Sequence, residues 1–320
     1  MRLYLSAFLI IWSLTSKAAE TLPWWAASAE EVLQAPCKTQ RPPTAEFMEQ
    51  ALTKLPGSSQ SRVLHGISFK NENSSLLQLF ADLHTYDLSL RGKPELRFTT
   101  SCTRVLCAMK ELYGNSEGVQ LLFLLKQFGF NGSHLRTTKA SAWSASELNE
   151  ILQALQDYPL HLYPVVYNKR LIHFTRGQRY SFGENIIANA SMEIFDAWNE
   201  LPFGERQQTL LHELGHTLAY RQRLDTSAEW LAIGGWKEVQ KNFEGHNYRD
   251  YVLEKPEKAV SEYGMLNPSE DFAESVVAYR FNGRRLLAQQ KEKYFFLKAK
   301  IFANQEFLSE DQCKATMQLP

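Results

Sequence analysis

Apolar residues recur at helical spacing along the first half of the chain. Residues from Ala45 to Leu55 predict a first helix, which follows an irregular stretch rich in proline and threonine. The segment 101–128 predicts two further helical pieces, and the second begins at Ser116 and ends at Gly129. We therefore expect an α-rich region before about residue 143. The apolar side chains of its last helix are Val119, Leu122, Phe123, Leu125 and Phe128.

The pattern changes near Ser144. The sequence Ser144-Ala145-Ser146-Glu147 is typical of a capping box, so a helix should begin here and run to about Asp157. Short β-prone runs follow, separated by turn residues, and we expect strands at 160–167, 171–174 and 185–190. A helix, then strands, then another helix predict an α+β fold. No segment recurs at a fixed period, which excludes repeat architectures.

The first eighteen residues differ from the rest of the chain. Arg2 gives a positive start, residues 3–14 are mostly apolar, and Ser16-Lys17-Ala18 offers small residues at the two positions that a signal peptidase inspects. The apolar run is shorter than the roughly 20 residues of a membrane-spanning helix. We therefore expect a cleaved secretory signal at 1–18, with an uncleaved anchor as the alternative. The mature chain would be exported, to the periplasm or outside the cell, and would not stay bound to a membrane.

Composition and charge change this picture little. The 320 residues are 44% hydrophobic, as in an ordinary globular protein, and basic and acidic residues number 35 each. No net field would attract nucleic acid or an anionic membrane. In an oxidising compartment the four cysteines favour disulfides. Cys102 and Cys107 would close a short loop, which leaves Cys37 for Cys313, although sequence alone permits all three pairings.

The most informative stretch contains the motif H-E-x-x-H. His212 and His216 lie four residues apart within a predicted helix, so both imidazoles project from one face and can bind one Zn²⁺. Glu213 lies at the margin of that face, where its carboxylate can act as general base on a zinc-bound water without being a ligand. Leucines cluster on the opposite side, where we expect them to pack: Leu210, Leu211, Leu214 and Leu218.

The alternative is that the motif arises by chance, because a chain with eight histidines can match H-E-x-x-H accidentally. The predicted helix, the opposed leucines and the export signal favour the metal site. A longer motif with a third histidine is excluded, because Ala219 and Gln222 occupy the positions of its glycine and histidine.

A catalytic zinc site needs a third protein ligand and one open position. Asn267 is a good N-cap and Pro268 suits the first helical position, so a helix should begin here and place Glu270 and Glu274 on one face. Glu270 would bind the metal, and Glu274 would accept a hydrogen bond from a ligating histidine. In the alternative interpretation Glu270 only closes a capping box and Glu274 faces solvent. The opposite face of this helix carries Phe272, Val276 and Tyr279.

The two segments together resemble the glutamate-liganded zincins, or gluzincins, in particular the catalytic domain of the anthrax lethal factor type. The resemblance covers roughly residues 204–281 and includes His212-Glu213-Leu214-Gly215-His216 and the run from Tyr263 through Asn267 to Phe272-Ala273-Glu274. It implies a zincin-like domain at 144–320, with a small mixed sheet, an active-site helix and a glutamate helix, after an α-rich region at 19–143. It also implies that Glu270 is the third ligand, that Glu274 lies behind the ligands and that the Tyr263 hydroxyl stabilises the oxyanion. Without the resemblance, Tyr263 reads as a half-buried aromatic.

Other donors lie between the two predicted helices and compete with Glu270. A ligand about twenty residues after the second histidine would fall at Trp236, which cannot bind zinc, and Glu238 fits this spacing only approximately. We expect Trp230 and Trp236 to pack in a core or to line a substrate cleft. The full set of competitors is Glu229, Glu238, Glu244 and His246.

These observations predict an exported zinc metallopeptidase, an endopeptidase, that uses one Zn²⁺ and acts on protein or peptide substrates. The extended run Asn185–Ala190 would pair with a substrate as an edge strand, or serve as an ordinary sheet strand. Two rival functions remain: a non-catalytic zinc-bearing binding protein, which has no need of Glu213, and an amidase that acts on cell-wall peptides.

Overall fold

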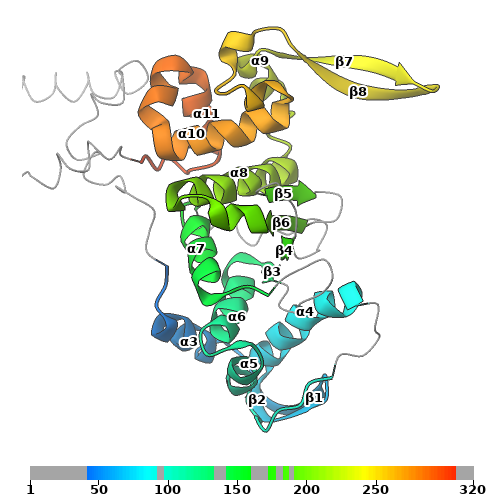
Figure 1. The fold of residues 1–320 in the computed structure, drawn as a ribbon, viewed down its shortest axis with the longest axis vertical. Coiled ribbons are helices and arrows are strands. Elements are labelled where there is room, and N and C mark those ends of the chain that lie inside the picture. The colour runs from blue at the N-terminus through cyan, green and yellow to red at the C-terminus, as the bar shows by residue number, and fades with distance from the viewer. Residues whose placement is uncertain are drawn as a thin grey trace, which may run out of the picture. The chain divides into compact units, whose positions relative to one another are not determined.

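The computed structural model describes residues 42–91, 97–132, 142–159, 172–177, 183–186 and 191–307 (Figure 1). Within them the chain forms two compact units, residues 42–223 and residues 224–307. Both contain helices and strands, which confirms the predicted α+β class. The expected domain boundary at residue 144 stays a prediction. The signal peptide expected at 1–18 also stays a prediction, because it lies outside the described residues. No described helix combines the length and apolar character that a membrane crossing requires.

The first unit begins with helices and one hairpin. The helix expected from Ala45 is α3 (Ala45–Thr53), which Thr44 caps by accepting a hydrogen bond from the backbone of Phe47. Helices α4 (Ser74–Arg91), α5 (Val105–Tyr113) and α6 (Glu117–Phe128) follow. Helix α6 agrees with the prediction at both ends and ends at Gly129 in the left-handed region, with φ 74°.

A β-hairpin in this α-rich region was not predicted. Strands β1 (Ser59–Leu64) and β2 (Ile67–Asn73) pair antiparallel through a two-residue loop. Both loop residues, His65 at φ 49° and Gly66 at φ 86°, adopt the positive φ that a type I′ turn requires. The side chains of β1 are almost all exposed, so the apolar alternation that reveals a strand is missing from its sequence.

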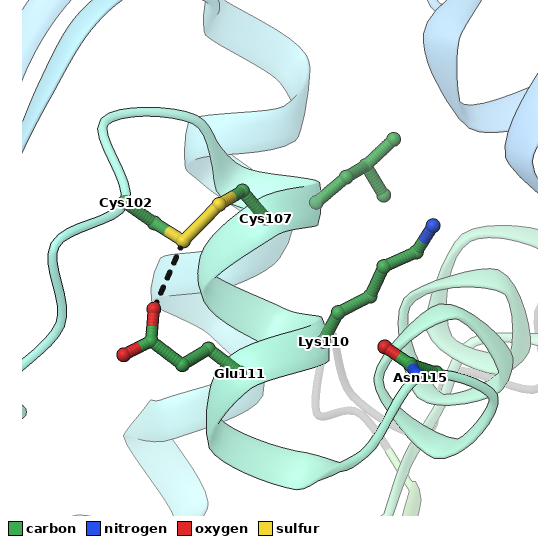
Figure 2. Close-up of a pocket in the computed structure, with 6 residues that line it drawn as sticks. Cys102, Cys107, Lys110, Glu111 and Asn115 are labelled. Atoms are coloured by element: carbon green, nitrogen blue, oxygen red, sulfur yellow. Dashed lines mark hydrogen bonds between the residues drawn. A yellow bond between two sulfur atoms is a disulfide. The ribbon is translucent and has the colours of Figure 1, made fainter.

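Helix α6 lies at the centre of this unit, and nearly all of its residues are buried. Gly118 lets α5 approach closely, because a β-carbon at this position would lie only 2.4 Å from the backbone oxygen of Met109. A disulfide joins Cys102 to Cys107, which lies in the first turn of α5, as the short loop between them suggested. Figure 2 shows that this disulfide lines a pocket together with Leu106, Lys110, Glu111 and Asn115. Cys37 and Cys313 lie outside the described residues.

The sheet of this unit has the order β3-β4-β6-β5 and mixed strand directions. Strands β3 (Phe130–Gly132), β4 (Ile172–Gly177) and β6 (Ser191–Phe195) run parallel, and β5 (Gly183–Ile186) pairs antiparallel with β6. Strand β4 confirms the strand expected at 171–174. The strand expected at 185–190 begins two residues earlier and is described only to Ile186, whereas 160–167 lies outside the described residues. In the described sheet β5 is an edge strand, whereas most of the run 185–190, expected as an edge strand or an ordinary sheet strand, lies outside the described residues.

The second unit holds the helix predicted to carry the glutamates. It contains α9 (Ala228–Gly234), the hairpin of β7 (Trp236–Phe243) and β8 (His246–Leu253), the 3₁₀ turns η5 (Pro256–Lys258) and η6 (Tyr263–Met265), α10 (Pro268–Gln289) and α11 (Lys291–Lys300). Its core is aromatic: the ring of Trp230 packs against Phe272 and Phe296, and its indole N–H donates to the backbone oxygen of Pro268 at 3.2 Å. Trp230 and Trp236 are both buried, which favours the core over the substrate cleft that was the alternative.

Candidate metal centre

Helix α8 (Phe203–Gln222) carries the H-E-x-x-H motif, and its first turns are tied to helix α7 (Ala145–Leu155). Helix α7 begins with the complete capping box predicted at Ser144. The Arg206 guanidinium bonds both carboxylate oxygens of Glu150, at 2.7 and 2.9 Å, and the Gln207 side chain donates to the Glu150 backbone oxygen. A two-point arginine–carboxylate pair fixes orientation as well as position. The start of α8 therefore has a defined direction within its unit.

Two further contacts hold α8 along its length. The short 3₁₀ helix η4 (Asp196–Glu200) precedes it, and the buried Trp198 donates its indole N–H to the Arg206 backbone oxygen at 3.0 Å. The buried Tyr158 hydroxyl donates to the Leu211 backbone oxygen, also at 3.0 Å, one residue before the first motif histidine. Burial raises the pKa of Tyr158 well above 10, and the neighbouring charge of Asp157 adds to this shift, so Tyr158 stays a hydrogen-bond donor.

The leucine face of α8 packs as predicted. The exposed fractions of its four leucines do not exceed 1%, and burying each such side chain contributes about 1.5–3 kcal/mol. These contacts fix the rotation of α8 about its axis, so the histidine face is determined by the opposite side of the same helix. The four residues are Leu210, Leu211, Leu214 and Leu218.

His212 and His216 meet on the other face. Their Nε2 atoms lie 3.1 Å apart, and their rings are nearly perpendicular, with centroids 4.8 Å apart. Two nitrogens bound to one tetrahedral zinc at about 2.0–2.1 Å would lie about 3.3 Å apart. The observed separation is therefore close to that of a two-histidine chelate. The same distance also fits a hydrogen bond in which one Nε2–H donates to the other Nε2.

Glu213 is buried, with 6% of its surface exposed, and His216 is buried to a similar extent. A buried carboxylate is costly unless a cation or hydrogen bonds stabilise it. The Glu213 backbone oxygen accepts from the Thr217 hydroxyl at 3.3 Å, which belongs to the same helix. Helix α8 thus presents two imidazoles and one buried carboxylate within five residues, which is the composition expected for ligands plus a general base.

The glutamate helix α10 begins where the sequence predicts. The Asn267 side-chain oxygen accepts from the backbone N–H groups of Ser269 and Glu270, at 2.9 and 3.0 Å, and Pro268 occupies the first helical position. Glu270 lies in the first turn and is half-buried. The apolar face that was expected on the opposite side of α10, Phe272, Val276 and Tyr279, is buried.

The remaining two predicted site residues also lie in the second unit. Glu274 is half-buried, and its carboxylate accepts from the Ser261 hydroxyl at 2.7 Å. The Ser261 oxygen in turn accepts from the backbone N–H of Gly264 at 3.0 Å, which ties the η6 turn to α10. Tyr263, in this turn, is 52% exposed and is not the half-buried aromatic of the alternative interpretation.

One group of side chains among the described residues has the donors to hold a metal ion: His212, His216 and Glu270. Two neutral imidazoles and one carboxylate form the donor set of several catalytic zinc sites, and it leaves a coordination position open. The histidines belong to the first unit and Glu270 to the second, so their joint use as ligands stays a prediction. No competitor belongs to this group: Glu229 pairs with Lys300 at 3.8 Å, Glu238 pairs with Arg249 at 3.7 Å, and Glu244 and His246 are exposed on the β7–β8 hairpin.

No protein family, curated protein or solved structure matches this chain. The likeness to the gluzincins therefore depends on the residues of the two motifs, and the function has to be argued from those residues.

Sequence reasoning missed a buried ion pair beside the predicted ligand. Asp271 and Lys293 are almost fully buried and lie 2.5 Å apart, and the Trp236 indole donates to the other oxygen of Asp271 at 3.2 Å. Burial raises the pKa of the Asp271 carboxyl and lowers the pKa of the Lys293 ammonium. The two charged residues lie 22 positions apart, and no periodic pattern pairs residues at such a distance.

Proposed function

We propose that this chain is an exported zinc metallopeptidase with a zincin-like domain, which hydrolyses peptide bonds in protein or peptide substrates. The observation that carries the proposal is the geometry of α8: His212 and His216 present their Nε2 atoms to each other at 3.1 Å, and the buried Glu213 lies beside the first of them. A metal-binding helix that only stabilised a fold would need the two histidines but not the carboxylate between them.

In this proposal Glu270 provides the third ligand. Its place in the first turn of α10 is fixed by the Asn267 cap, and a carboxylate there completes the two-histidine, one-glutamate donor set. Glu274 would accept a hydrogen bond from a ligating histidine, while the Ser261 hydroxyl holds the other side of its carboxylate. Such support fixes the orientation of a ligating ring.

The reaction then follows from the residues of the chain. A zinc ion, when bound, lowers the pKa of water and polarises the scissile carbonyl. Glu213 accepts the proton of the attacking water and later delivers it to the leaving nitrogen. The Tyr263 hydroxyl, on an exposed turn, donates a hydrogen bond to the oxyanion that forms on the substrate. The edge position of β5 supports its use as a partner strand for an extended substrate.

The first experiment compares the mature chain with Glu213→Gln. We expect about one zinc per chain in both proteins, and a loss of cleavage of about 10²–10⁴-fold in the variant, measured with a peptide library. Glu205→Gln is the matched control, because Glu205 is exposed in the first turn of the same helix and should leave both zinc content and rate unchanged.

Undiminished cleavage by Glu213→Gln would overturn the proposed mechanism. Zinc without any cleavage by the wild-type chain would instead favour a binding protein. Cleavage restricted to cell-wall peptides in the same library would favour the amidase.

A further inference from the structure

The two cysteines of the Cys102–Cys107 disulfide differ in their access to solvent. Both line the pocket beside α5, but Cys102 is only 8% exposed, whereas Cys107 is an exposed residue (Figure 2). Thiol–disulfide exchange begins when a thiolate reaches one of the two sulfurs of a disulfide. An external thiol therefore reaches Cys107 more readily than Cys102.

Other contacts fix the segment that this disulfide closes. The Thr103 backbone oxygen accepts from the Lys70 backbone N–H at 3.0 Å. The Glu72 carboxylate, also on β2, accepts from the Arg104 guanidinium at 3.1 and 3.2 Å and from the Val105 backbone N–H at 2.7 Å. The two cysteines are only five positions apart, and a disulfide stabilises a fold less when the loop that it closes is short. The bond can therefore break and form again while the segment stays in place.

A carboxylate lies against the buried sulfur. The Glu111 Oε2 atom is 3.1 Å from the Cys102 Sγ atom (Figure 2). A disulfide sulfur carries no hydrogen, so this contact is a full hydrogen bond only when Cys102 is a thiol that donates to the carboxylate. The same oxygen accepts from the Thr100 hydroxyl at 2.5 Å, and the Thr100 oxygen accepts from the Cys102 backbone N–H at 3.0 Å. The carboxylate is thus held where it stabilises the reduced form of Cys102.

The exposed sulfur lies in a different electrostatic environment. Cys107 is the third residue of α5, and within the described residues the Arg104 N-cap gives this helix end no side-chain hydrogen bond. The backbone N–H groups and the dipole of a helix favour negative charge in its first turn. Thiolates at helix N-termini are stabilised in this way. Reduction should therefore favour a thiolate at Cys107 and a thiol at Cys102.

We propose that the Cys102–Cys107 disulfide is redox-active and exchanges with external dithiols at Cys107. One thiol of the dithiol loses its proton to water, and its sulfur attacks the Cys107 sulfur. A mixed disulfide forms, and Cys102 leaves with the electron pair of the broken bond, takes a proton from water and donates a hydrogen bond to Glu111. The second thiol, also deprotonated, attacks its partner sulfur in the mixed disulfide and releases Cys107 as a thiolate. The dithiol is oxidised by two electrons, and the cysteine pair is reduced by two.

The reverse reaction gives Glu111 a second role. Its carboxylate accepts the proton of the Cys102 thiol, and the resulting thiolate attacks the Cys107 sulfur of the mixed disulfide and closes the bond again. This chemistry needs no metal and does not depend on the proposed peptidase function.

Equilibration with glutathione, two molecules of which replace one dithiol, tests whether the bond is redox-active. Trypsin cleaves after Arg104, between the two cysteines, so alkylation and mass spectrometry measure each of them separately and apart from Cys37 and Cys313. At about 10 mM reduced glutathione and about 0.1 mM of its disulfide, we expect more than half of the pair to be reduced in the folded wild-type chain, because disulfides that only stabilise a fold resist this thiol. A pair that stays oxidised would overturn the proposal.

The variant Glu111→Ala removes the acceptor for the reduced Cys102. In the same buffer the ratio of reduced to oxidised pair should fall about threefold or more, as expected for the loss of one hydrogen bond. Glu205→Ala is the matched control, because it removes an exposed carboxylate from the first turn of α8 and should leave the ratio unchanged. An unchanged ratio in Glu111→Ala would contradict the role given to this carboxylate.

Single variants identify the sulfur that is attacked. In Cys102→Ser, the remaining Cys107 should form a mixed disulfide with oxidised glutathione at least about tenfold faster than Cys102 does in Cys107→Ser. Equal rates, or a faster reaction of Cys102, would rule out Cys107 as the point of entry.

Hydrogen exchange separates a redox-active bond from a structural one. After reduction of the wild-type chain, peptides that contain the Lys70 and Val105 amides should keep their protection, because Thr103 and Glu72 still accept from these amides. If reduction removes this protection, the disulfide holds the segment in place and the proposal fails.

Discussion

His212 and His216 face each other across one turn of α8, with their Nε2 atoms 3.1 Å apart. Packing of the leucine face sets the rotation of this helix, and the Arg206–Glu150 pair sets its direction, so the two imidazoles are positioned by residues that take no part in chemistry. Such preorganisation would lower the cost of assembling the proposed metal site, because the helix already holds two imidazoles in place.

The role of Glu270 is tested through metal affinity. We expect Glu270→Ala to weaken zinc binding by more than the 10–100-fold that is typical for loss of a supporting residue, because a ligand itself is removed. Competition with a chromogenic chelator measures the effect. If this variant binds zinc with wild-type affinity, Glu270 is not a ligand. The competitors Glu238 and His246, on the β7–β8 hairpin, would then be the next residues to replace.

The Asn267 cap provides a second test, which separates local stability from metal binding. Asn267→Ala removes the acceptor for two backbone N–H groups and should cost about 1 kcal/mol of stability. Thr44→Ala removes the corresponding cap of α3 and should cost a similar amount. We expect only Asn267→Ala to weaken zinc binding, because Glu270 lies in the turn that loses its cap. Equal zinc affinities in the two variants would show that the cap does not position Glu270.

Local signals in the sequence were sufficient for much of the fold. The capping box at Ser144, the left-handed Gly129 and the Asn267-Pro268 start of α10 each depend on a few adjacent residues, and each lies where it was expected. The two hairpins were not predicted. Strand β1 and most of β7 are exposed on both faces, so their sequences lack the alternation that marks a half-buried strand, and their turns contain no Asn-Gly or Asp-Gly pair.

In the candidate site, too, features that depend on nearby residues were predictable, whereas contacts between distant residues were not. The helical placement of His212 and His216 follows from four-residue spacing, and the structure confirms that they share a face. Contacts between residues far apart in sequence were not predictable. The hydroxyl of Ser261, thirteen residues before Glu274, and the ammonium of Lys293 become partners of carboxylates on α10 only through folding.

The buried pair of Asp271 and Lys293 makes a strong prediction about stability. Lys293→Met removes the ammonium, which lies 5.3 Å from the centroid of the Trp230 ring, and leaves the Asp271 carboxylate without its cation. We expect a loss of about 3–5 kcal/mol in the free energy of unfolding, measured with urea. The double variant Asp271→Asn with Lys293→Met should recover part of this loss, because no charge is then left buried. A single variant as stable as wild type would show that the pair contributes little.

A last prediction concerns the stability of the first unit at acid pH. His84 is fully buried: its Nδ1–H donates to the Phe80 backbone oxygen at 2.6 Å, and its Nε2 accepts from the Tyr113 hydroxyl at 2.5 Å. Burial lowers the pKa of His84 from 6.5 to about 3, although the bond to Phe80 opposes the shift. The folded state thus keeps His84 neutral, while the unfolded state binds a proton below pH 6.5.

The neutral His84 imidazole contributes its full stabilisation to the folded state above pH 6.5. As the pH falls from 6.5 towards 3, this contribution is lost at about 1.4 kcal/mol per pH unit, because only the unfolded state binds the proton. Between pH 7 and pH 5 the wild-type chain should therefore lose about 2 kcal/mol more than His84→Gln, because glutamine can donate and accept but does not titrate. Urea unfolding at both pH values measures this difference, and acidic groups common to both chains cancel in the comparison. If both proteins lose the same free energy of unfolding between pH 7 and pH 5, His84 is protonated in the folded chain. The prediction of a buried neutral imidazole would then be wrong.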